Sequence, residues 1–271
     1  MNRISKRLAD IKASGKKALV TYIVHGDPRT DVTLPALHAL VEAGTDVIEL
    51  GVPFSDPMAE GPVIQRGHER ALGNGASLSS AMALVAEFRK TDSETPVVLM
   101  GYANPVERMG YKTLAAVAAE SGVDGLLTVD LPPEEAKDLD AELKAHGLHS
   151  IFLIAPTTVD QRIADVTQLA AGFVYYVSLK GVTGAGHLDI GSVESKLADI
   201  RKHTALPVLV GFGIKDKASA QAVGAVSDGV VVGSVLVNAM GDKAQAGIDE
   251  ICETLKQLIE PIRAGLDELA Q

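Results

Sequence analysis

One carboxylate, Glu49, stands in the middle of an apolar run, the sequence VIELGV from residue 47 to 52. Such a run predicts a strand that is buried on both faces. A carboxylate inside it loses its hydration water, so it needs a charged partner, a proton or a catalytic role. Because the chain continues into an acidic loop stiffened by proline, with Ser55, Asp56 and Glu60, we interpret Glu49 as a group for proton chemistry. The alternative is a structural ion pair with a Lys or Arg of a neighbouring strand.

Glycines at the ends of two predicted strands indicate a phosphate site. Glycine lets backbone N–H groups approach an anion, and the start of a helix favours negative charge. A phosphate site built from the last two strand–helix loops recurs in α/β barrels for these reasons. Gly184, in the loop GVTGAG, is expected to close over the same site. The alternative is that these glycines serve only tight turns. The residues at the two strand ends are Gly211, Phe212, Gly213, Gly233 and Ser234.

Four other polar side chains stand at or near predicted strand ends. Tyr175 lies inside FVYYVS, and Tyr102 ends PVVLMGY; each is either part of a site or an ordinary aromatic of the core. Asp130 is expected to be the N-cap of the helix that follows it, a position that favours Asp. His25 follows the first strand, and we expect it to be a satisfied polar residue rather than a ligand.

The elements that must position these residues alternate between strand and helix. Alternating βα units imply a parallel sheet, and eight of them in this length favour a closed barrel. We therefore predict a (β/α)8 TIM barrel with an extra N-terminal helix, 3–12, as a plug, and a single domain spanning 1–271. An open doubly wound sheet is the alternative, but no GxGxxG opens the first unit. The helical patterns include 105–120 as one helix and 248–269, which Pro261 should kink or divide. The predicted strands are 18–24, 46–52, 96–102, 125–129, 150–154, 173–178, 207–210 and 229–232.

Composition excludes several classes of function. The net charge of −10 argues against nucleic acid and against an anionic membrane surface. Cys252 is the only cysteine, and the seven histidines lack metal-binding spacing, so we expect no disulfide and no metal. The charged N-terminus does not look like a signal peptide, and no apolar run is long enough to span a membrane. We expect a cytosolic protein.

The sequence resembles the α subunit of tryptophan synthase. The resemblance rests on IELGVPFSDPMAEGPVIQ (48–65), YAN (102–104), SLKGVTG (178–184), GFGI (211–214) and VVGS (231–234), in order across nearly the whole chain. It implies retro-aldol cleavage of indole-3-glycerol phosphate to indole and glyceraldehyde 3-phosphate. Glu49 matches the main acid–base residue, and Tyr175 matches a tyrosine beside the substrate. The second acid falls on Glu60, where the usual residue is Asp. The positions that match substrate or phosphate ligands are Tyr102, Thr183, Gly184, Phe212, Gly213, Gly233 and Ser234.

The resemblance also implies a partner, the β subunit of tryptophan synthase, in an α2β2 heterotetramer. The loop 53–57 and the loop around 180 would contact or respond to that partner, which carries pyridoxal phosphate, while the α chain itself would bind no cofactor. Three alternatives stay open. They are a Schiff-base aldolase that uses Lys180, a lyase that releases indole without a partner, and a non-catalytic barrel that activates the β subunit.

Overall fold

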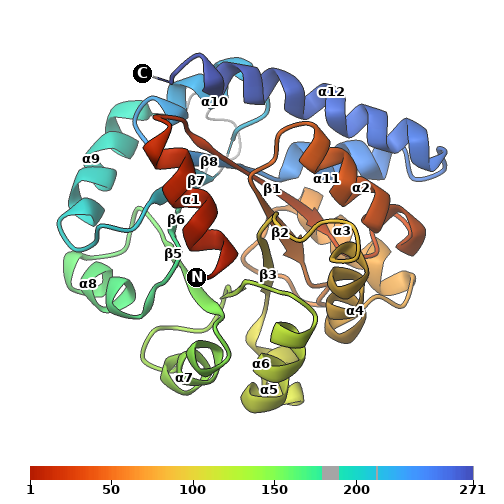
Figure 1. The fold of residues 1–271 in the computed structure, drawn as a ribbon, viewed down its shortest axis with the longest axis horizontal. Helices are drawn as coiled ribbons and strands as arrows, with labels where there is room; N and C mark the ends of the chain where they lie inside the picture. The colour runs from red at the N-terminus through yellow and green to blue at the C-terminus, as the bar shows by residue number, and fades with distance from the viewer. Residues whose placement is uncertain (179–188, 212, 271) are drawn as a thin grey trace.

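The computed structural model describes residues 1–178, 189–211 and 213–270. Its centre is a closed barrel in which each strand pairs in parallel with the next and β8 returns to β1 (Figure 1). The predicted (β/α)8 barrel is therefore confirmed. The strands are β1 (Ala18–Val24), β2 (Val47–Gly51), β3 (Val97–Gly101), β4 (Gly125–Thr128), β5 (His149–Ile154), β6 (Val174–Val177), β7 (Val208–Gly211) and β8 (Gly229–Val232).

Helices surround the barrel, and the first of them closes its amino-terminal end (Figure 1). Among the described residues, no helix is long and apolar enough to cross a membrane. The helices are α1 (Arg3–Ala13), α2 (Thr30–Glu42), α3 (Pro62–Gly73), α4 (Leu78–Phe88), α5 (Ala103–Met109), α6 (Tyr111–Glu120), α7 (Lys137–Ala145), α8 (Asp160–Leu169), α9 (Ile190–Arg201), α10 (Lys217–Gly224), α11 (Ser234–Asp242) and α12 (Ile248–Asp267).

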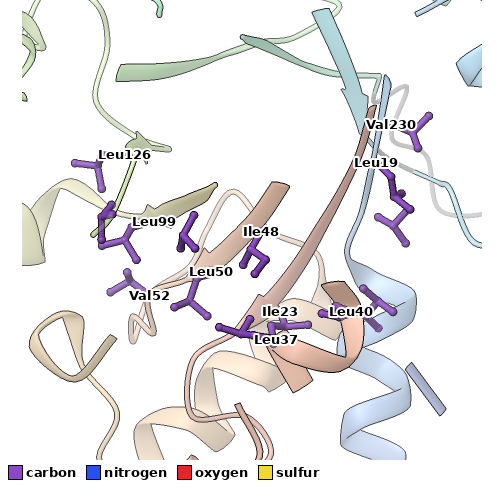
Figure 2. Packing of buried hydrophobic residues seen from close by; sticks show 14 of the residues in the cluster. Leu19, Ile23, Leu37, Leu40, Ile48, Leu50, Val52, Leu99, Leu126 and Val230 are labelled. Atoms are coloured by element: carbon purple, nitrogen blue, oxygen red, sulfur yellow. The ribbon is translucent and has the colours of Figure 1, made fainter. Parts of the chain in front are cut away.

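The strands are buried on both faces because successive side chains point alternately into the barrel and out toward the helices. In β2, Ile48 and Leu50 point outward and pack in the layer that also holds Leu37 and Leu40 of α2 (Figure 2). Val47 points into the barrel interior, where it packs in one cluster with inward-facing residues of the other seven strands. Ile4, Leu8 and Ile11 of α1 pack against that interior, so the predicted N-terminal plug is confirmed. The buried interior residues are Ala18, Val20, Val47, Val98, Leu127, Ile151, Leu209 and Val231 of the strands, together with Phe173 directly before β6.

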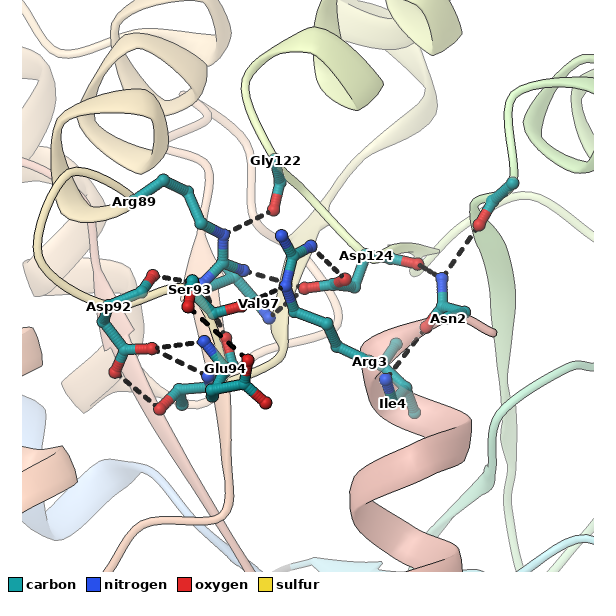
Figure 3. Close-up of polar contacts among 12 residues, drawn as sticks. Asn2, Arg3, Ile4, Arg89, Asp92, Ser93, Glu94, Val97, Gly122 and Asp124 are labelled. Carbon is teal, nitrogen blue, oxygen red and sulfur yellow. Dashed lines mark hydrogen bonds and ion pairs between the residues drawn. The ribbon is translucent and has the colours of Figure 1, made fainter.

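A polar network fixes α1 to the amino-terminal end of the barrel (Figure 3). Its centre is Asp124, which is 2% exposed and accepts from Arg3 Nη1 at 3.0 Å, Arg89 Nη2 at 2.8 Å and the Val97 N–H at 2.9 Å. Asn2 caps α1 by accepting from the Ile4 N–H, and its amide donates to the Asp124 carbonyl. These donors satisfy a carboxylate that would otherwise be costly to bury.

The structure differs from the sequence analysis in four places. The helix predicted at 105–120 is two helices, because Gly110 adopts φ +83° between α5 and α6. α3 was not predicted, since its polar residues and Pro62 resemble a continuation of the loop before it. Of the kink or division predicted at Pro261, the division does not occur, since α12 runs as one 20-residue helix through this proline. Asp130 does not cap the helix that follows it; its Oδ1 accepts from the N–H of Ala103, in the first turn of α5, at 2.7 Å.

Candidate active site

A cavity of about 360 Å³ opens at the carboxyl ends of the strands, where α/β barrels place their chemistry. Most of the residues in its wall are apolar, and they come both from inward-facing positions of the strands and from the loops and helix starts that follow the strands. The polar side chains on the wall are two tyrosines, two glutamates and one serine. The residues that line it are Tyr22, Glu49, Ala59, Glu60, Gly61, Pro62, Val63, Ile64, Met100, Val129, Leu153, Tyr175, Val177, Gly213, Ile214, Val231, Gly233 and Ser234.

A larger cavity, of about 440 Å³, lies at the opposite end of the barrel beside α1. Its wall is basic, and three of its four cations have partners among the described residues. Lys16 lies 3.7 Å from Asp267, and Arg201 Nη2 lies 3.4 Å from Asp228. Lys17 Nζ donates to a backbone carbonyl at 2.8 Å. Because it holds no pair of carboxyl groups and lies at the amino-terminal end, we assign the chemistry to the smaller cavity.

Glu49 points into the smaller cavity from the middle of β2 and is 1% exposed. Its Oε1 has no hydrogen-bond partner among the described residues. Loss of hydration, and secondly the nearby charge of Glu60, raises the pKa of the Glu49 carboxyl to about 8. No Lys or Arg lines this cavity among the described residues, which speaks against the structural ion pair. A carboxyl that keeps its proton near neutral pH is suited to act as a general acid.

Glu60 reaches the same cavity from the loop between β2 and α3, and its side chain is 6% exposed. The loop around it is tied down by backbone groups. The Glu60 N–H donates to the Pro57 carbonyl at 3.1 Å, and Gln65 Nε2 donates to the Glu60 carbonyl at 2.8 Å. The Ala59 N–H donates to Tyr102 Oη at 3.1 Å. The loop therefore holds the second carboxyl group at the cavity wall.

Two residues that the sequence analysis did not select, Tyr22 and His68, lie beside Glu60. His68 Nε2 is 3.2 Å from Tyr22 Oη and 3.1 Å from Glu60 Oε2. The alternation along β1 could have identified Tyr22, because it shares a register position with Glu49. His68 gave no such signal, since it lies on a helix that was not predicted.

Tyr175 lines the cavity from β6, the strand that pairs with β7. Burial, followed by the charges of Glu49 and Glu60, raises the pKa of its phenol well above the ordinary value, so it stays protonated. Its hydroxyl lies against Gly211, where a Cβ atom would come within 2.2 Å of Oη. A side chain at 211 would push the ring out of this place.

The predicted phosphate residues that the structure describes meet on one wall of the cavity. Gly213 has φ +76°, a conformation that favours glycine, and open space where a Cβ atom would stand. Gly233 precedes α11, and Ser234 is its first residue. The amino-terminal end of α11 therefore opens on the cavity, as a phosphate site requires. Thr183, Gly184, Phe212 and Lys180 lie outside the described residues.

Tyr102 and His25 take supporting positions. Tyr102 does not line the cavity; it stacks on Phe54 with ring centroids 5.0 Å apart and holds the acidic loop. Its contact with a substrate stays a prediction. His25 Nε2 lies 2.8 Å from Ser80 Oγ, whereas the buried Nδ1 has no hydrogen-bond partner among the described residues, so the expected satisfied polar residue is found at only one of the two ring nitrogens. No group of three or more potential metal ligands occurs in the part of the chain that the structure describes.

Comparison with known proteins agrees with this geometry. The family model "Tryptophan synthase alpha chain" matches residues 8–265. The tryptophan synthase alpha chain of Thiobacillus denitrificans is 54% identical over 267 residues, which cover 98% of this chain and 97% of the relative. That of Thioalkalivibrio sulfidiphilus is 56% identical over 95% of this chain and 98% of the relative. The crystal structure of tryptophan synthase subunit alpha from Legionella pneumophila is similar with a TM-score of 0.91, 44% identity and 99% of each chain covered.

Proposed function

Because the chain belongs to the tryptophan synthase alpha chain family, and is thus a lyase that cleaves indole-3-glycerol phosphate to indole and glyceraldehyde 3-phosphate, we propose that Glu49 transfers the protons of this cleavage. The observation that carries the proposal is a buried carboxyl group in the cavity wall whose pKa is about 8. A retro-aldol reaction needs a proton at the carbon that leaves and a base at the hydroxyl group that becomes an aldehyde.

One carboxyl group can serve both needs in sequence. The protonated Glu49 gives its proton to C3 of the indole ring, and the positive charge moves to the ring nitrogen. The resulting carboxylate then takes the proton of the glycerol hydroxyl group next to C3. The hydroxyl oxygen becomes a carbonyl, the carbon–carbon bond breaks, and its electrons neutralise the ring. Glu49 ends with a proton, as it began.

We propose that Glu60 stabilises the charge that develops on the ring nitrogen. A carboxylate at the indole N–H stabilises positive charge on the ring, and it does so more strongly in a cavity from which water is excluded. The low exposure of Glu60 and its place in the lining of the same cavity as Glu49 support this role. Tyr175, which also lines this cavity, is proposed to contact the substrate beside the two carboxyl groups.

The phosphate group is proposed to accept hydrogen bonds from the backbone N–H groups of Gly213, Gly233 and Ser234. The positive φ of Gly213 and the start of α11 support this placement. We further propose Gly184 and Thr183 as ligands that complete the site, Phe212 as a neighbour of the substrate, and Tyr102 as a substrate contact. These four assignments rest on the sequence motifs.

Turnover of the Glu49→Gln variant tests the proposal. The glutamine side chain keeps the size of the glutamate but cannot exchange a proton, so indole release should nearly stop while substrate affinity changes little. Glu87→Gln, at an exposed glutamate of α4, is the matched control and should keep full activity. If the Glu49→Gln variant kept most of its turnover, another residue would be the acid–base group.

Alpha chains of this family pair with a beta subunit, which holds pyridoxal phosphate, and use no cofactor of their own. We propose an α2β2 assembly in the cytosol, with residues 1–271 as one domain. The exposed loop after β2, with Met58 83% exposed, supports a contact there. Indole release should be slow for the chain alone and rise sharply when a beta subunit is added. Fast release alone would indicate an independent lyase, and no release in either case a non-catalytic activator.

A further inference from the structure

His68 is a buried histidine in the second turn of α3 that the reaction above does not use. It is 1% exposed, and its ring lies where the loop after β2, strand β1 and helix α3 meet. Nδ1 contacts the loop after β2, and Nε2 contacts both strand β1 and the same loop. A buried imidazole with defined partners on both sides has a fixed orientation, and that orientation determines where its proton points.

The loop fixes the tautomer of the ring. The Phe54 N–H donates to His68 Nδ1 at 3.0 Å. Nδ1 must therefore present a lone pair, and the proton of the neutral ring is on Nε2. Phe54 is held in turn by its stack on Tyr102, with the ring planes 22° apart. The backbone of the acidic loop thus sets the direction in which His68 donates.

The Nε2–H group faces two acceptors at nearly equal distance. Tyr22 Oη lies at 3.2 Å and Glu60 Oε2 at 3.1 Å. The contact with Tyr22 has the geometry of a hydrogen bond, whereas Glu60 Oε2, although only 3.1 Å from Nε2, has no hydrogen-bond partner among the described residues. A small rotation of either side chain brings the N–H onto the carboxylate, and a bond to a charged acceptor is the stronger of the two.

We infer that His68 is a positioning residue for Glu60, and that its Nε2–H group holds the Glu60 carboxylate at the cavity wall where the indole nitrogen is bound. The inference rests on the role proposed for Glu60. Glutamate has one more rotatable bond than the usual aspartate, so its carboxylate has more orientations to lose when it acts on the ring. A fixed donor beneath it limits those orientations.

Two variants separate the two nitrogens of the ring. His68→Gln can place an amide donor near Nε2, and His68→Asn keeps an acceptor near Nδ1 but has no donor that reaches Glu60. We expect the Asn variant to lose about ten- to a hundredfold in kcat, the size of one hydrogen bond to a charged group, with little change in KM. The Gln variant should keep most of the activity. His203→Asn, at a histidine 2.8 Å from Asp160 on the surface, is the matched control and should behave as the native chain.

A double-mutant cycle with Glu60→Gln distinguishes this inference from the proposed function. If His68 acts through Glu60, the loss caused by His68→Asn should largely disappear in the Glu60→Gln background. A loss of equal size in both backgrounds, or equal losses for the Asn and Gln variants, would overturn the inference and leave the role of Glu60 intact. Native kcat in Glu60→Gln itself would overturn both.

The native chain gives a test that does not depend on the folding of any variant. The 15N chemical shifts of the His68 ring report which nitrogen carries the proton. We expect the Nε2–H tautomer in the native chain. The Nδ1–H tautomer would contradict the donation from Phe54 and overturn the inference.

Discussion

Replacing Glu49 by Gln should stabilise the fold, and the gain should grow as the pH rises. In the native chain the carboxyl keeps its proton up to a pKa of about 8, against 4.5 for an ordinary glutamate. Between these values the unfolded chain releases the proton and the folded chain does not, so the free energy of unfolding falls with pH. Glutamine does not titrate. From pH 5 to pH 7 the unfolded carboxyl gains about 2 to 3 kcal/mol by ionising, at about 1.4 kcal/mol per pH unit above its pKa.

The assay is urea unfolding of both chains at pH 5 and pH 7, followed by circular dichroism. The quantity of interest is the free energy of unfolding of the variant minus that of the native chain, because other titrating groups cancel in this difference. It should increase by about 2 to 3 kcal/mol between the two pH values. Glu87→Gln, at an exposed position, should show no such increase. A difference that stays constant with pH would refute the claim that burial keeps the proton on Glu49.

Three further predictions concern the cavity and the opposite end of the barrel. Ser234→Asp puts a negative charge at the proposed phosphate site and should raise KM at least about tenfold, by roughly 1.4 kcal/mol or more of lost binding; an unchanged KM in steady-state kinetics would place the phosphate elsewhere. Gly211→Ala puts a Cβ atom 2.2 Å from Tyr175 Oη and should cost about 1–3 kcal/mol of stability in urea unfolding and lower turnover; native values for both would mean that the ring moves freely. Asp124→Ala leaves Arg89 without its buried partner and should cost about 3–5 kcal/mol by the same unfolding assay, whereas the rate of indole release per folded molecule should not change.

Much of the barrel was predictable because its strands have a local signature. A parallel strand that is buried on both faces is a continuous apolar run, so β1 and β8 were predicted with their observed bounds. Helices with a clear apolar stripe were found in the same way. The split at Gly110 was not, because a helical periodicity on both sides hides a single residue with positive φ. Asp130 was misassigned because its partner, the N–H of Ala103, is 27 residues away in the chain.

The site was predictable to the extent that its residues belong to strands. The position of Glu49 in β2 fixes its direction, since Val47 on the same face lies in the barrel interior. The approach of Glu60 and His68 depends on how a loop and a helix fold back over β1, which no local pattern encodes. The pKa of Glu49 has the same origin. It depends first on the loss of water and then on Glu60, and both are properties of the assembled cavity.

The buried carboxyl groups at the two ends of the barrel differ in their hydrogen-bond donors. Asp124 is 2% exposed and accepts from two arginines and a backbone N–H, so its burial holds α1 in place. Glu49 is 1% exposed, and Oε1 has no hydrogen-bond partner among the described residues. A donor at Glu49 would stabilise the carboxylate and lower its pKa, and the group would then lack the proton that C3 requires. The missing partner is therefore a condition of the reaction. Burying a carboxyl group without a partner lowers the stability of the fold, and removing that group would also remove the acid–base residue. We therefore expect Glu49→Gln both to raise the free energy of unfolding and to lower turnover.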